Sequence, residues 1–233
     1  MNEKLSMFWS GVRAEFPLLV GVFPFGMIYG ALALNAGLSQ AASQMMSSIV
    51  FAGSSQFIAA QLAHDAAPGL VIVLTIAVVN LRHMLYSASL APYLRDLHIR
   101  WKVLLAYLLT DEAYAPTALK YTKEGITPLG HWFLFGAGLS LWTIWQASTA
   151  LGIFLGASIP KDWPLDFALP LTFIALVMPA LKNRPAIAAA LSAGLVAVLA
   201  YGLPFRLGLI LAALTGILVG TILEGRKSPR GTL

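Results

Sequence analysis

The sequence predicts an all-α polytopic membrane protein with about seven or eight transmembrane helices. Of its 233 residues, 58% are hydrophobic and 11% are charged, whereas soluble domains carry roughly 25% charged residues. The mean hydropathy is +0.78. Apolar runs reach about 20 residues, the length that an α-helix needs to cross a bilayer. We expect residues 1–233 to form a single transmembrane domain, with a cytoplasmic N-terminal segment at 1–16 and a cytoplasmic tail at 224–233.

A series of apolar segments follows along the chain. They lie near 17–36, 43–63, 68–91, 101–119, 131–157, 164–181, 186–203 and 206–223. Segment 43–63 is rich in Ser and Gln, so it either crosses the membrane or forms a re-entrant hairpin. If every segment crosses and both chain ends are cytoplasmic, Arg95, Arg100 and Lys102 fall on the outer side, against the positive-inside rule. The hairpin alternative would bring these three residues inside.

Two stretches favour broken or kinked helices. In FAGSSQF, residues 51–57, Gly53 precedes Ser54 and Ser55, which makes local unwinding easy. The alternative is that these small residues only permit tight packing. In GVFPFGMIYG, Pro24 removes a backbone hydrogen bond and Gly26 follows it, so a kink is expected there. Pro24, Gly26 and Gly53 are thus hinge candidates.

Small residues also recur at helix-packing spacing. Three GxxxG pairs would let helices approach closely, either inside the protein or at a subunit interface: Gly26 with Gly30, Gly152 with Gly156, and Gly216 with Gly220. No sequence repeat is evident. An inverted repeat stays open, because such repeats are often weak in sequence.

Several function classes are excluded by missing residue patterns. The chain has no Cys, so disulfides, thiol catalysis and cysteine metal sites are excluded. Its four His residues, at 64, 83, 98 and 131, lie on separate segments without ligand spacing. The sequence lacks GxxxxGK[ST] and GxSxG. We therefore expect no enzyme activity, metal or cofactor. The net charge of +5 is spread over loops and termini, which favours contact with anionic lipid over nucleic acid.

Charged residues inside apolar segments are the main candidates for function. Arg82 lies within NLRHMLY, and Asp111 and Glu112 lie within LTDEAYA. An unpaired charge near the membrane centre costs roughly 2.5–3.5 kcal/mol, so these groups must be paired or hydrated. Asn80 and His83 share one helical face and Arg82 occupies another, which predicts a helix central to the bundle. Arg82 either locks the bundle through an acid or handles substrate or protons.

His83 adds a group that changes charge near neutral pH. Beside Asp111 or Glu112 it could relay protons across the membrane. The alternative is a buried His that only satisfies hydrogen bonds.

Five motifs in order resemble the AzlC family, the large subunit of branched-chain amino acid exporters. They are PFGMIYG at 24–30, FAGSSQF at 51–57, NLRHMLYSASLAP at 80–92, LTDEAYA at 109–115 and LVMPALKNRP at 176–185. The resemblance covers nearly the whole chain. It implies a bacterial inner-membrane protein that exports leucine, isoleucine, valine and methionine with a small AzlD-type subunit. The family's polar motifs fall on Ser54, Ser55, Gln56, Asn80, Arg82, His83, Asp111 and Glu112.

Residues and resemblance together predict a secondary transporter that binds a zwitterion. The expected substrate-binding residues are Ser54, Ser55, Gln56, Asn80, Arg82 and Asp111, and the expected proton-coupling residues are His83, Asp111 and Glu112. The substrate side chain would enter an apolar pocket built from residues such as Phe25, Phe51 and Phe57. The alternative is a passive channel or a membrane scaffold whose polar groups only hold subunits together.

Overall fold

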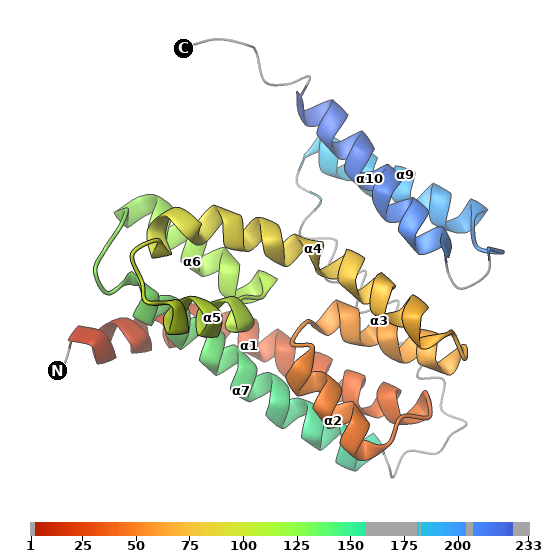
Figure 1. Ribbon diagram of the computed structural model, residues 1–233, viewed down its shortest axis with the longest axis horizontal. Coiled ribbons are helices and arrows are strands. Elements are labelled where there is room, and N and C mark those ends of the chain that lie inside the picture. The colour runs from red at the N-terminus through yellow and green to blue at the C-terminus, as the bar shows by residue number, and fades with distance from the viewer. Residues whose placement is uncertain (1–2, 157–180, 182, 204–206, 226–233) are drawn as a thin grey trace. The chain divides into compact units, whose positions relative to one another are not determined.

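A computed structural model describes residues 3–156, 181, 183–203 and 207–225. All regular structure in this part of the chain is helical, which confirms the predicted all-α class. The helices are α1 (Glu3–Asn35), α2 (Gln40–Ile49), α3 (Gly53–His64), α4 (Gly69–Leu94), α5 (Ile99–Leu108), α6 (Asp111–Glu124), α7 (Gly130–Gly156), α9 (Arg184–Leu199) and α10 (Leu207–Gly225) (Figure 1). Among them, α1, α4 and α10 are long and apolar enough to cross a membrane.

The helices divide between two compact units. The first holds Met1–Ala66 and Ile72–Trp163, and the second holds Ala67–Val71 and Pro164–Leu233. In the first unit, α1 and α7 lie side by side (Figure 1). They run parallel, because Gly11 lies against Phe133 while Gly30, farther along α1, lies against Thr149.

Glycines make the close approach of α1 and α7 possible. A Cβ at Gly30 would lie 2.4 Å from the Thr149 carbonyl oxygen, and one at Gly152 would lie 2.1 Å from the Met27 carbonyl oxygen. The GxxxG spacings on these two helices therefore serve packing within the chain.

The segment from α2 to α3 folds back on itself. Tyr29 of α1 donates a hydrogen bond to the Ser43 carbonyl of α2 at 3.1 Å. After a break at residues 50–52, Phe57 of α3 returns to the same tyrosine, with 5.8 Å between ring centroids. The predicted break beside Gly53 is confirmed. Since α2 leaves the end of α1 and α3 returns toward it, the structure agrees with the hairpin alternative for 43–63.

The segment from α5 to α6 forms a second hairpin. α5 starts just after α4 ends. α6 starts beside the middle of α4, where Asp111 pairs with Arg82. Its last turn lies beside the end of α4, where Tyr121 and Tyr93 have ring centroids 5.0 Å apart. α5 therefore runs against α4, and α6 runs along it.

The second hairpin contradicts the prediction of one continuous helix over 101–119. The apolar run ends at Thr110, whose hydroxyl accepts a hydrogen bond from the Ala113 amide and caps α6. A Thr followed by two acids is a helix-start signal that hydropathy alone passes over.

The two hairpins are related by inversion. Each follows a long helix, α1 or α4, and consists of a 10-residue helix, a break and a second helix of 12 or 14 residues. α4 runs against α1, so the hairpins start from opposite ends of the unit and their tips converge (Figure 1). This arrangement also resolves the charge problem in the sequence. With two re-entrant hairpins, Arg95, Arg100 and Lys102 fall on the same side as the start of α1.

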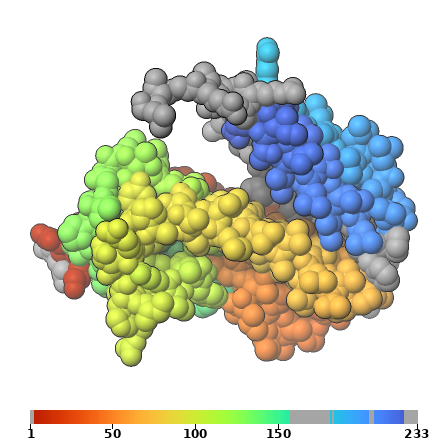
Figure 2. Space-filling view, turned by 45° about the horizontal axis from the view of Figure 1, so that its top comes forward, coloured from red at the N-terminus to blue at the C-terminus, as the bar shows by residue number. Residues whose placement is uncertain are grey.

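Within the first unit, the helix of Arg82 does not occupy the central position that the sequence predicted. On α4 only Thr75 and Leu90 are buried, and large side chains such as Met84 and Leu85 are exposed. Figure 2 shows α4 as a continuous yellow band on the surface. On α4, the side chains of Asn80, Arg82 and Ser89 make their hydrogen bonds to α3 and α6, so the rest of the helix can stay apolar and exposed.

The second unit contains the pair α9 and α10. A Cβ at Gly216 would lie 3.1 Å from the Ala193 Cβ, so this GxxxG glycine also serves packing within the chain. The predicted segments at 186–203 and 206–223 agree with α9 and α10 within a few residues. The segment predicted at 164–181 lies outside the described residues, except for residue 181. α1 begins at Glu3 rather than near residue 17.

Candidate functional site

An ion pair joins the two hairpin tips to α4. Arg82, at the middle of α4, donates through Nη1 to Asp111 Oδ2 at 3.0 Å, which identifies the acid that the sequence left open. Its Nη2 donates to the Ser54 hydroxyl. The Arg82 and Asp111 side chains are 28% and 33% exposed in the structure. One guanidinium thus links the first turns of α3 and α6.

The two helix starts at this junction differ in their capping. At α3, the N-cap residue is Ala52, which offers no side-chain acceptor to the first-turn amides of Gly53, Ser54 and Ser55. At α6, Thr110 provides a cap, and two acids occupy the first turn. The start of α3 therefore presents uncompensated positive partial charge, while the start of α6 presents carboxylates.

The remaining predicted binding residues support this junction. Ser55 donates to Asn80 Oδ1 at 2.6 Å, which adds a second link between α3 and α4. Gln56 is fully buried and its amide donates to the carbonyls of Ser47 and Val50. These contacts bridge the break between α2 and α3, so Gln56 holds the tip in shape.

His83 and Glu112 lie beside the ion pair. The His83 ring packs 5.9 Å from the Tyr86 ring, and its Nε2 is buried without a hydrogen-bond partner among the described residues. Glu112 follows Asp111 in the first turn of α6. His83 directly follows Arg82, the partner of Asp111, on α4, but the structure records no hydrogen bond between His83 and either acid.

The hinge candidates occupy two settings. Pro24 lies inside α1, which stays helical on both sides of it. A Cβ at Gly26 would lie 2.0 Å from Ser148 Oγ, and one at Gly53 would lie 3.0 Å from the Trp145 ring. Gly26 is therefore required for close packing on α7, while Gly53 leaves room for the Trp145 ring. Their predicted role as hinges stays a prediction.

The expected aromatic pocket is instead a packed cluster. Phe25 and Phe57 have ring centroids 4.6 Å apart, and Phe25 also lies 5.8 Å from Trp145. Phe57 is fully buried, and Phe51 packs against Tyr107 instead, with 6.2 Å between ring centroids. These rings fill the space that the sequence assigned to a substrate side chain.

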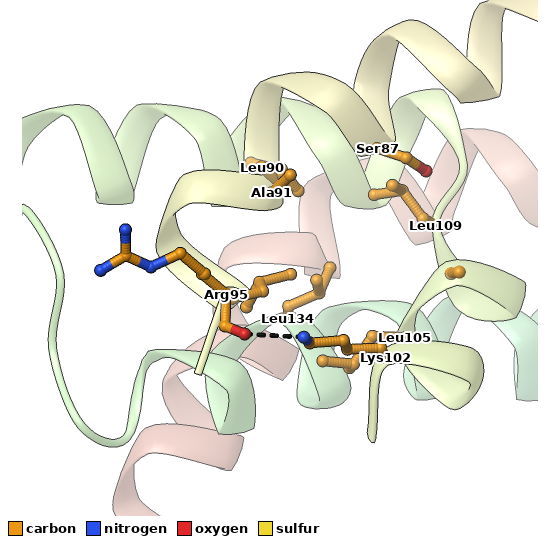
Figure 3. Close-up of a pocket in the computed structure, with 10 residues that line it drawn as sticks. Ser87, Leu90, Ala91, Arg95, Lys102, Leu105, Leu109 and Leu134 are labelled. Atoms are coloured by element: carbon orange, nitrogen blue, oxygen red, sulfur yellow. Dashed lines mark hydrogen bonds between the residues drawn. The ribbon is translucent and has the colours of Figure 1, made fainter. Parts of the chain in front are cut away.

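A pocket of about 350 Å³ lies on the other side of the junction, between α4, α5 and α7 (Figure 3). Its lining is mostly aliphatic: Ser87, Leu90, Ala91, Leu94, Arg95, Lys102, Leu105, Ala106, Leu109 and Leu134. The Lys102 ammonium donates to the Arg95 carbonyl at 2.6 Å, while Figure 3 shows the Arg95 guanidinium pointing away from the pocket. Leu109 lies two residues before Asp111, so the pocket lining includes part of the break that leads into α6.

Sequence reasoning missed two polar features. Gln146 of α7 accepts from Gln44 at 2.8 Å and donates to the Ser47 carbonyl at 3.0 Å, which ties the first hairpin to α7. Glu15 of α1 is fully buried, and its carboxylate has no hydrogen-bond partner among the described residues. Glu15 falls just before the predicted apolar run at 17–36, where hydropathy gives no reason to expect burial. Among the described residues, no group of three or more His, Asp or Glu side chains could hold a metal.

Fold and site define a polytopic α-helical membrane protein with paired re-entrant hairpins and a charged junction at their tips. A family model described as AzlC protein matches residues 17–159. The chain belongs to the AzlC family.

Relatives span most of the chain. An uncharacterized membrane protein of Archaeoglobus fulgidus is 31% identical over 93% of this chain and 95% of its own length. The inner membrane protein YgaZ of Escherichia coli is 26% identical over 91% of this chain and 90% of its own. The branched-chain amino acid transport protein AzlC of Bacillus subtilis is 28% identical over 76% of this chain and 70% of its own. No solved structure matches the chain.

Proposed function

We propose that this protein is the large subunit of a secondary exporter of branched-chain amino acids, with leucine, isoleucine, valine and methionine as substrates. The observation that carries the proposal is the convergence of two inverted hairpin tips on Arg82. Unwound backbone at membrane depth is tolerated where it lines a cavity, and transporters bind substrates at such breaks. The name of the Bacillus subtilis relative supports the substrate class.

The junction has the charge pattern of a zwitterion site. The substrate carboxylate would bind Arg82 and the uncapped amides of α3 beside Ser54. The substrate ammonium would bind Asp111 at the start of α6. An amino acid would thereby exchange one internal ion pair for two, while Ser55, Asn80 and Gln56 keep the α3 tip in place.

The aliphatic side chain of the substrate would occupy the pocket beside α5. Ser87, at the pocket edge, is five residues from Arg82, which corresponds to about 7.5 Å along α4. Leu90, Leu105 and Leu109 then provide an apolar wall. Apart from Ser87, Arg95 and Lys102, the residues that line the pocket are aliphatic, which favours aliphatic substrates.

Export against a gradient needs an energy source, and proton coupling fits this site. His83, Asp111 and Glu112 would change protonation as the cavity opens to opposite sides of the cytoplasmic membrane. Pro24, Gly26 and Gly53 would be the hinges of that change. A small AzlD-type subunit would complete the exporter.

The proposal is tested by reconstituting the chain with an AzlD-type partner in liposomes and measuring efflux of labelled leucine across an imposed pH gradient. We expect saturable, gradient-driven efflux that is weakened by Asp111→Asn and unchanged by Asp96→Asn, since Asp96 pairs only with exposed Arg95. Efflux without saturation or counterflow would indicate a channel. Intact complexes that transport no amino acid would indicate a scaffold and contradict the proposal.

A further inference from the structure

Glu15 is the most unusual side chain in the first unit. It is fully buried on α1, and both carboxylate oxygens lack a hydrogen-bond partner among the residues that the structure describes. Gly11 and Leu19, one turn to either side, are also buried. An ionised carboxylate is strongly disfavoured in such a setting unless a cation or donors compensate it.

The charged groups around Glu15 supply no compensation. α1 packs against α2, α3, α6 and α7. α2 carries no titratable side chain, α3 carries only His64 in its last turn, and α7 carries only His131 in its first turn. On α6, an ionised Glu112 would repel a negative charge on Glu15.

The cations in this region are already engaged. Arg82 is paired with Asp111 at 3.0 Å. Lys120, two turns farther along α6 than Glu112, is paired with Glu124 at 2.7 Å. Arg13 is exposed on the opposite side of α1. A carboxyl group that is buried, unpartnered and next to a second carboxyl group is best accommodated by binding a proton.

The position of Glu15 connects the candidate site to one side of the membrane. Phe25 packs beside Gly53 at the α3 tip, and Glu15 precedes it by ten residues, or about 15 Å along α1. Glu112 lies next to Asp111, the proposed ligand of the substrate ammonium. The Glu15 carboxyl is therefore placed between the junction and the end of the unit where α1 starts.

We propose that Glu15, buried on α1, and Glu112, in the first turn of α6, form a proton-binding pair, and that proton binding there competes with binding of the substrate at Asp111. This inference rests on the proposed function and names the site of its coupling. When the junction is empty, the negative charges of Asp111, Glu112 and Glu15 favour uptake of one proton. When a substrate ammonium binds Asp111, its positive charge favours the ionised pair and the proton leaves. Mutually exclusive binding of proton and substrate is the requirement for antiport, in which protons enter as amino acids leave.

The test begins with proton binding itself. Infrared difference spectra of the purified complex, recorded while the pH is raised, should show loss of a protonated carboxyl band that is missing in Glu15→Gln. Glu3→Gln, on the exposed first turn of the same helix, is the control and should keep the band. Glu112→Gln provides a second variant. Because it removes a neighbouring negative charge, it should shift loss of the Glu15 band to lower pH. Identical spectra for wild type and Glu15→Gln would overturn the inference whatever the substrate.

The second measurement links the pair to transport. Adding leucine to the wild-type protein in weakly buffered solution should release protons, detected with a pH indicator, and Glu15→Gln should release none.

The third measurement is export from liposomes. Coupling between two ligands typically changes affinity by 5–150-fold, so we expect export driven by a pH gradient to fall about tenfold in Glu15→Gln. Leucine exchange without a gradient should persist in that variant. If export by Glu15→Gln depends on the pH gradient as strongly as export by the wild type does, the proposal is contradicted. It is also contradicted if export by the wild type depends on a sodium gradient instead. A carboxyl band with no response to leucine would contradict the proposed substrate rather than the proton site.

Discussion

The two hairpin tips have the same architecture but opposite chemistry. Each is a break between a 10-residue helix and a longer one, and each places a helix start beside Arg82. The α3 start is uncapped and carries hydroxyl groups, while the α6 start is capped by Thr110 and carries two acids. Inverted repeats therefore bring two similar backbones together, and the side chains at their tips decide which pole of a zwitterion each would bind.

The second tip packs tightly on α7, and disturbing this packing gives the largest expected loss of stability. The second tip rests on α7 at Gly138, where a Cβ would lie 2.8 Å from the Leu108 Cβ and 2.9 Å from its carbonyl oxygen. Gly138→Val should therefore destabilise the protein by about 3 kcal/mol, measured as thermal unfolding in detergent. Gly21→Val is the control, because no atom lies within 4 Å of its Cβ position. Equal effects of the two changes would contradict this packing.

A smaller effect is expected from separating Arg82 and Asp111. A double-mutant cycle with Arg82→Gln and Asp111→Asn should give a coupling energy of about 1–2 kcal/mol, below that of a fully buried pair because both groups are partly exposed. The same cycle on Arg95 and Asp96, which are 78% and 85% exposed, should give less than about 0.5 kcal/mol. A coupling energy near zero for the first pair would mean that the junction does not hold the tips together.

Capping tests the difference between the tips directly. Thr110→Ala removes the α6 cap and should cost about 1 kcal/mol, whereas Thr122→Ala, which removes only an exposed hydroxyl in the same helix, should cost less. Chemical denaturation compares the two variants. Equal costs would show that Thr110 does not stabilise the start of α6.

Adding a cap to α3 should have the opposite consequences for stability and transport. Ala52→Ser would supply the missing acceptor and should stabilise the protein by about 0.5–1 kcal/mol. If the uncapped amides bind the substrate carboxylate, the same change should raise the KM for leucine. A stabilised variant with unchanged KM would show that these amides do not bind substrate.

The sequence was informative wherever one segment carried the signal. Charges at Arg82, Asp111 and Glu112 predicted a polar site from the free energy of burying charge, and Gly53 predicted the first break. Hydropathy could not reveal that 101–119 turns back, because both halves of a re-entrant hairpin are apolar and only the cap at Thr110 marks the break. Tertiary packing decided the rest. The burial of Glu15, the filling of the aromatic cluster by Phe25 and Phe57, and the outer position of α4 depend on contacts between segments far apart in sequence.

Leucine counterflow in liposomes tests the central claim most directly, because exchange needs the substrate site but no driving force. We predict that Arg82→Gln abolishes saturable exchange while Arg100→Gln, an exposed change in the first turn of α5, preserves it. If Arg82→Gln folds, assembles and exchanges leucine as the wild type does, the junction at the hairpin tips is a structural lock and not the substrate site.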